Sequence, residues 1–131
     1  MLTPPATLGI RHVALSVSDL KAAEGFYCGV LGYQVEWRPD ADNLYVTMNG
    51  HDNLALHKAT KALGETRLDH FGIVVKAAAD VDAWCAHLKA HGARILKEPK
   101  THRDGARSFY CADPDGNVLQ FLHHPPISER A

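Results

Sequence analysis

Cysteine is scarce in this chain of 131 residues, and no apolar run approaches the length of a membrane span. The three cysteines, at positions 28, 85 and 111, are odd in number and form no CxxC pair, so we expect buried reduced thiols rather than disulfides or a zinc ribbon. A transmembrane helix needs about 20 apolar residues, and residues 1–9 lack the basic start and apolar centre of a signal peptide. We therefore expect a cytoplasmic protein with no membrane partner.

An excess of charge of either sign is also missing. Lysine and arginine number 14, aspartate and glutamate number 15, and the formal net charge is -1. A protein that binds nucleic acid through its backbone phosphates shows a basic excess, so we expect no nucleic-acid partner. The hydrophobic content of 46% suffices for one sizeable core, which predicts a single domain over residues 1–131 and leaves small molecules as partners.

The order of predicted elements occurs twice. In each unit, about residues 10–58 and 67–123, a strand leads into a helix that ends at a glycine, and three short strands follow. The pattern is therefore α+β, with two βαβββ units whose helices cover one face of the strands. The predicted strands cover residues 10–17, 33–37, 44–48, 54–58, 68–75, 93–96, 107–112 and 117–123. The helix of the second unit is predicted over about residues 80–91, where the residues on its apolar face are Val81, Trp84, Cys85 and Leu88.

A histidine lies near the start of the first strand in each unit, His12 in one and His70 in the other. An imidazole in an apolar strand needs a partner, and a duplicated unit can bring both copies to one point, which predicts a metal site. Alternation along strands places His57 and Gln120 on the face away from the helices, where they can converge with the first pair. The remaining histidines are interpreted as surface residues without converging partners: His51, His87, His91, His123 and His124.

The repeated βαβββ order, the paired histidines and the ending from Asp113 to Gln120 resemble the vicinal oxygen chelate superfamily. That superfamily includes glyoxalase I, extradiol ring-cleavage dioxygenases, and fosfomycin and bleomycin resistance proteins. The resemblance spans roughly residues 10–123 and implies a cupped mixed sheet with helices on its outer face. It also implies a divalent metal with open positions for a substrate that offers two adjacent oxygens. His12 and His70 match the two ligand histidines of the family.

Gln120 stands where the family usually has a metal-binding glutamate. Two imidazoles and a carboxylate suit Fe(II) or Mn(II), and an amide oxygen is a weaker, uncharged donor, so we expect lower metal affinity. We expect Fe(II) or Mn(II) first, with Zn(II) or Ni(II) as alternatives.

A more specific resemblance, to the extradiol dioxygenase signature, covers His102 and residues 109–120. It departs from the signature at Lys100, where a small residue is usual, and at Gln120. The resemblance implies that Tyr110 and His102 flank a bound catecholate and hydrogen-bond its oxygens. His57 is the candidate acid/base, with a fourth metal ligand as the alternative role.

Three functions stay open at this point. Extradiol cleavage of a small aromatic diol ranks first, because glyoxalase I uses a metal-bound carboxylate as its base and neither Gln120 nor residues 54–58 supply one. A glyoxalase-like lyase ranks second, and a non-catalytic protein that binds antibiotics or other aromatic ligands, with Trp37, Tyr45 and Tyr33 as candidate lining residues, ranks third. A homodimer is expected in each case, since paired-unit folds commonly bury a sheet edge or exchange a unit.

Overall fold

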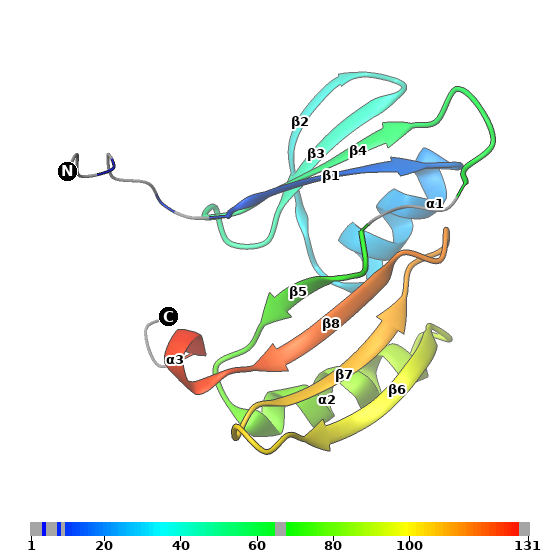
Figure 1. Cartoon of the computed structure of the whole chain (residues 1–131). Helices are drawn as coiled ribbons and strands as arrows, with labels where there is room; N and C mark the ends of the chain where they lie inside the picture. The colour runs from blue at the N-terminus through cyan, green and yellow to red at the C-terminus, as the bar shows by residue number, and fades with distance from the viewer. Residues whose placement is uncertain (1–3, 5–7, 9, 65–67, 129–131) are drawn as a thin grey trace. The chain divides into compact units, whose positions relative to one another are not determined.

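The computed structural model describes residues 4, 8, 10–64 and 68–128, and its chain divides into two compact units, residues 1–63 and 64–131 (Figure 1). Each unit holds one four-stranded sheet. The predicted α+β class and the repeated βαβββ order are confirmed. Within the described ranges, no helix has the length and apolar character that crossing a membrane requires.

The first unit forms a sheet in the order β1-β4-β3-β2, in which β1 runs parallel to β4 and the other pairs are antiparallel. Asp19 caps the helical segment by accepting a hydrogen bond from the backbone N–H of Ala22 at 3.1 Å. Gly32, with a φ of 88°, ends it. The elements are β1 (His12–Val17), α1 (Leu20–Glu24) continued by the π-helix η1 (Gly25–Val30), β2 (Gln34–Asp40), β3 (Asn43–Thr47) and β4 (Asn53–Lys58).

The second unit repeats this arrangement in the order β5-β8-β7-β6, again with the first and last strands parallel. A short terminal helix, which the sequence patterns did not indicate, is tied to the unit by Ser128, whose hydroxyl donates to the Val75 carbonyl at 2.7 Å. The elements are β5 (Phe71–Val74), α2 (Ala78–Ala90), β6 (Arg94–Thr101), β7 (Arg107–Ala112), β8 (Val118–His123) and α3 (Pro125–Ser128).

The strand registers of the two units match, so that positions in one unit can be paired with positions in the other. In the first unit Ala14 pairs with Ala55 across the parallel β1–β4 ladder, and in the second Gly72 pairs with Gln120 across β5–β8. In both units the histidine predicted to bind metal lies two residues before the first member of the pair. The duplication predicted from the sequence is thus present in the backbone.

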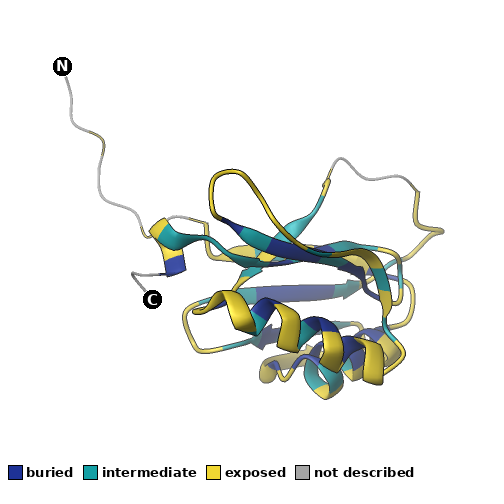
Figure 2. Cartoon of the chain, turned by 90° about the horizontal axis from the view of Figure 1, so that it is seen from below, coloured by how far each residue is buried: buried dark blue, intermediate teal, exposed yellow. Residues whose placement is uncertain are grey.

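One face of each sheet is buried under its helix, and the opposite face carries the candidate functional residues. On β8, Leu119 and Phe121 are fully buried, whereas Gln120 between them is only half-buried. Helix α2 buries the residues that its spacing predicted and leaves its outer side exposed, as Figure 2 shows in yellow: Val81, Cys85 and Leu88 are buried, and Trp84 stacks on Phe121 at 5.1 Å. Full burial of an aliphatic side chain such as Val81 or Leu88 contributes roughly 1.5–3 kcal/mol to folding.

The three cysteines are free thiols, as the sequence predicted, with Cys85 and Cys111 buried and Cys28 half-buried. Burial raises the pKa of the Cys111 thiol to about 12 and also raises the pKa values of the other two. A protonated thiol is a poor nucleophile and a poor metal ligand. We therefore assign the cysteines a packing role within their own units.

The surface prediction is wrong for two of the remaining histidines. His123 and His124 are half-buried, and the Nδ1 of His123 is buried with no hydrogen-bond partner among the described residues, because this residue continues the buried side of β8. His87 and His91 are exposed as predicted, but their ring centroids lie 4.3 Å apart, one helical turn from each other on α2. His51 is exposed.

Candidate functional site

The open face of the first sheet carries His12 and His57. His12 begins β1, and His57 lies near the end of β4, where it pairs in register with Ser16. Strand alternation puts both rings on the side away from the buried leucines, as the sequence predicted. Both rings bind asparagines through Nδ1: His12 to Asn53 at 2.7 Å and His57 to Asn43 at 2.6 Å.

Two aromatic rings border His57 on the same face. Tyr45 meets the His57 ring edge to face at 5.8 Å between centroids, and Trp37 stacks on Tyr45 at 5.3 Å with an interplanar angle of 19°. Trp37 is 59% exposed, so it presents a flat apolar surface to solvent. Tyr33, the third candidate lining residue, is instead buried and packs edge-on against Tyr27 at 6.0 Å.

In the second unit His70 lies just before β5 and is held between a carboxylate and an aromatic ring. Its Nδ1 lies 2.6 Å from Oδ2 of Asp69, and its ring meets Tyr110 edge to face at 5.3 Å between centroids. An ionised carboxylate only accepts hydrogen bonds, so Nδ1 is the donor in this pair. The carboxylate thereby holds the ring in a fixed orientation.

Gln120 lies beside the same tyrosine. Its Nε2 donates to the Tyr110 hydroxyl at 3.1 Å, which places Oε1 on the other side of the amide, and Tyr110 pairs with Gln120 in the β7–β8 register. A methyl group built on Gly72 would contact Oε1 at 4.0 Å, so this glycine leaves the space beside the amide oxygen open. Lys97 completes the group, with Nζ 5.5 Å from the Tyr110 ring centroid.

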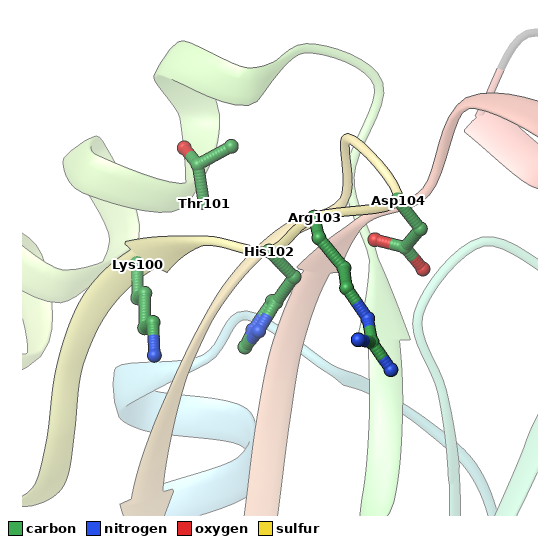
Figure 3. Close-up of a pocket in the computed structure, with 5 residues that line it drawn as sticks. All are labelled: Lys100, Thr101, His102, Arg103 and Asp104. Atoms are coloured by element: carbon green, nitrogen blue, oxygen red, sulfur yellow. The ribbon is translucent and has the colours of Figure 1, made fainter.

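His102 lies in the turn between β6 and β7 and reaches back to the sheet. Its Nε2 lies 3.0 Å from the hydroxyl of Ser108, a buried residue two positions before Tyr110 and on the same face of β7. Figure 3 shows His102 together with Lys100 and Arg103 on one side of this turn, with Thr101 on the other. The turn lines a pocket of about 640 Å³.

The structure therefore groups the six predicted site residues by unit. In the second unit Tyr110 contacts both His70 and Gln120, and His102 lies in the adjoining β6–β7 turn, where it contacts Ser108. In the first unit His12 and His57 share one open face. The roles assigned to these residues stay predictions.

Sequence reasoning missed the residues that orient the histidines. Asp69 precedes His70 directly, so an Asp-His dipeptide at the start of a strand was the available signal. Asn43 and Asn53 could be found only through cross-strand pairing, because each lies far from its histidine in the chain. Ser108, the partner of His102, falls inside an apolar strand and gave no signal.

The predicted donors suit a divalent cation in their chemistry. In His12 and His70 an oxygen engages Nδ1, and a neutral ring that donates from Nδ1 has its lone pair on Nε2, the usual arrangement of a metal-bound histidine. The NH2 group of the Gln120 amide donates to Tyr110, so the amide oxygen is the atom that could bind a metal. Three or more His, Cys, Asp or Glu side chains do not gather into a metal-binding group anywhere in the described ranges. Two imidazoles and an amide therefore stay a predicted donor set.

Comparison with known proteins gives the family. The family model "Glyoxalase/Bleomycin resistance protein/Dioxygenase superfamily" matches residues 9–121. A 3-methylcatechol 2,3-dioxygenase of Pseudomonas putida is 32% identical over 123 residues, which cover 86% of this chain and 41% of that protein, so the chain spans about two fifths of this relative. A probable lactoylglutathione lyase of Synechocystis is 22% identical over 122 residues, covering 86% of this chain and 93% of that protein.

Solved structures agree on the fold. An integron cassette protein from the mobile metagenome of the Halifax Harbour sewage outfall superposes with a TM-score of 0.79 at 22% identity, covering 90% of this chain and all of the other. At that identity the match speaks for the fold alone. The family model, by contrast, covers nearly the whole chain. The chain therefore belongs to the glyoxalase/bleomycin resistance protein/dioxygenase superfamily.

Proposed function

We propose that this chain is a metal-dependent dioxygenase that cleaves a small aromatic diol beside its hydroxyl groups. His12, His70 and the Gln120 amide oxygen hold Fe(II) or Mn(II) in this proposal. Tyr110, His57 and His102 supply the hydrogen bonds and proton transfers. The relative named as a 3-methylcatechol 2,3-dioxygenase supports the reaction class.

One observation carries the choice of dioxygenase over lyase. In the proposed site the last strand of each unit offers one side chain from the open face of its sheet, at the position that pairs with Gly72 or Ala14. This residue is Gln120 in the second unit and Ala55 in the first. Neither is acidic. A lyase of the glyoxalase I type removes a carbon-bound proton with a metal-bound carboxylate, and neither position supplies one. Ring cleavage needs only neutral metal ligands and nearby acid/base groups.

A metal bound by these residues would hold two adjacent substrate oxygens and dioxygen at its open positions. His57 then takes the proton of a substrate hydroxyl on Nε2, since its Nδ1 is engaged by Asn43. Tyr110 accepts a hydrogen bond from Gln120, so its own proton is free to donate to an oxygen of the substrate. The exposed face of Trp37 supplies an apolar surface for an aromatic ring.

Oxygen uptake tests the proposal. Protein loaded anaerobically with Fe(II) should consume oxygen when given catechol or 3-methylcatechol and release a coloured ring-opened product in equal amount. His57→Asn should lower the turnover number by at least about 100-fold, the usual contribution of a general acid or base. His51→Asn, which changes an exposed histidine in the turn before β4, is the matched control and should leave turnover unchanged.

A glyoxalase-like lyase is the second candidate, and one carboxylate favours it. Glu36 lies on the open face of the first sheet, where its Oε1 accepts a hydrogen bond from Asn53, the residue that binds His12. With Ni(II) or Zn(II) bound, proton exchange on a methylglyoxal–thiol adduct that stops in Glu36→Ala would establish the lyase. If both assays are silent and metal-free protein binds aromatic drugs tightly, the chain is a binding protein.

A further inference from the structure

The two histidines of the first sheet are each connected through an asparagine to a carboxylate. His12 Nδ1 lies 2.7 Å from Oδ1 of Asn53, and the Nδ2 of the same asparagine donates to Oε1 of Glu36 at 2.9 Å. We call these three residues the His12 relay. All three are on the open face of the sheet, and they come from β1, β4 and β2.

The second set has the same composition and order. His57 Nδ1 lies 2.6 Å from Oδ1 of Asn43, whose Nδ2 donates to the Asp40 carboxylate at 2.9 and 3.1 Å. We call these residues the His57 relay. Asp40 also accepts from the backbone N–H of Asp42 at 2.8 Å, so the turn between β2 and β3 holds this carboxylate in place.

The carboxylate at the end of each relay determines where the protons are. An ionised carboxylate has no hydrogen to donate, so the asparagine must turn its NH2 group toward it. The amide oxygen then faces the imidazole, and because that oxygen only accepts, the facing Nδ1 must carry the proton. In the neutral ring Nε2 is left with the lone pair. A free neutral imidazole in water prefers the opposite tautomer, with the proton on Nε2.

Irregularities in β2 bring both carboxylates into position. Between the pairs Val35–Val46 and Trp37–Tyr45 the register shifts by one residue, which inserts Glu36, and a second shift precedes Asp40. The first shift lets Glu36 reach the open face, where its neighbour Trp37 already lies on Tyr45. Bulges re-aim side chains in this way, and a regular strand would place Glu36 and Trp37 on opposite faces.

The second unit shows that the fold does not require the relays. Strand β6 has its register shifts at the equivalent places, between Ile95 and Lys97 and between Lys97 and Lys100. Yet the positions equivalent to Asn53 and His57 on β8 are Val118 and Leu122, two residues either side of Gln120. The relay residues are therefore features of the first unit's own sequence.

We propose that Glu36 and Asp40 are positioning residues that hold His12 and His57 in the Nδ1-protonated tautomer, with Nε2 presented from the open face of the sheet. For His12 this makes Nε2 a ready metal ligand, and for His57 it makes Nε2 the proton acceptor. These uses rest on the proposed function, whereas the tautomers themselves do not. The carboxylates act through the asparagines and do not touch the substrate.

Nitrogen-15 NMR of the histidine rings tests the proposal on full-length, metal-free protein. The spectra are recorded at about pH 8.5, roughly two units above the ordinary histidine pKa, and in a neutral imidazole the nitrogen with the lone pair resonates well downfield of the protonated one. We expect His12 and His57 to show the lone pair on Nε2. A wild-type protein with the proton on Nε2 of both rings would overturn the proposal without any substitution.

Two isosteric substitutions serve as controls for each other. Glu36→Gln and Asp40→Asn keep size and an accepting oxygen but let the asparagine turn either way. Glu36→Gln should move only His12 toward the Nε2-protonated tautomer, and Asp40→Asn should move only His57. If neither ring responds, or if both rings respond to both substitutions, the relays do not position the rings.

Functional readouts then separate this proposal from the proposed activity. Loss of an outer partner of a ligating histidine typically weakens metal binding about 10- to 100-fold, so Glu36→Gln should weaken Mn(II) binding by that factor while Asp40→Asn leaves it unchanged. Asp40→Asn should instead lower kcat for the aromatic diol with little change in KM. Tautomers that respond as expected in a protein that never consumes oxygen would disprove the dioxygenase and leave the relays standing.

Discussion

Replacing Gln120 by glutamate should tighten divalent metal binding, because the substitution turns a neutral oxygen donor into a charged one at the same place. Nε2 of Gln120 donates to the Tyr110 hydroxyl at 3.1 Å. In the variant the hydroxyl can rotate and donate to the carboxylate, so the hydrogen bond survives with its direction reversed. The side chain is half-buried, and the substitution adds no atoms.

The size of the effect follows from two opposing energies. Charges of +2 and -1 at about 2.1 Å attract by about 16 kcal/mol at an effective dielectric constant of 20. Removing water from the carboxylate and the cation costs several kcal/mol for each ion, and the neutral amide already contributes as a ligand. Most of the attraction is therefore offset. We expect the dissociation constant to fall at least tenfold, equivalent to about 1.4 kcal/mol.

Titration with Mn(II) measures this change, with free ion followed by electron paramagnetic resonance at fixed pH and salt. Gln34→Glu is the matched control, since Gln34 is exposed on β2 of the first unit and the substitution adds the same charge there. Equal or weaker Mn(II) affinity in Gln120→Glu would refute the assignment of Gln120 as a ligand. An equal gain in Gln34→Glu would show that net charge alone attracts the ion.

Three further predictions concern the framework around the site. Phe121→Ala should lower the free energy of unfolding by about 3–5 kcal/mol in urea melts, because the ring is fully buried between two stacked aromatic side chains; a loss below 1 kcal/mol would contradict this packing. Asp113→Ala should cost about 1–3 kcal/mol, since the carboxylate accepts from the backbone of Asp115 and from the backbone and side chain of Asn117; Asp42→Ala, at an exposed turn position, is its control. Burial raises the pKa of Cys111 to about 12, so the unfolded chain loses this proton first and stability should fall as pH rises from about 9 to about 12. Cys111→Ala should flatten that slope, and identical slopes would show that the thiol does not contribute.

The element order could be read from the sequence because apolar periodicity and glycine stops are local signals. Helix α2 and strand β7 were predicted within two residues of their bounds, since Val81, Cys85 and Leu88 repeat at helical spacing and residues 107–112 are followed by a strong turn. Strand alternation also gave the correct face for His57 and Gln120, because burial of the neighbouring leucines and phenylalanine leaves one choice.

The partners of the histidines could not be read from the sequence, because they depend on register. Asn53 meets His12 only through the parallel β1–β4 pairing, across 41 positions of chain. Glu36 reaches Asn53 only because β2 is bulged, and regular alternation cannot anticipate a bulge. The half-buried state of His123 was missed for a related reason, since a polar residue at a strand end was assumed to be solvated.

In the proposed function His12 and His70 bind the same cation, and metal stoichiometry in single and double variants tests this proposal most directly. Calorimetric titration with Mn(II) or Zn(II) should give one ion per wild-type chain. His12→Ala and His70→Ala should each abolish that stoichiometric binding, and the double variant should be no worse than either single one. Retention of one tightly bound ion after removal of either histidine alone would contradict the account.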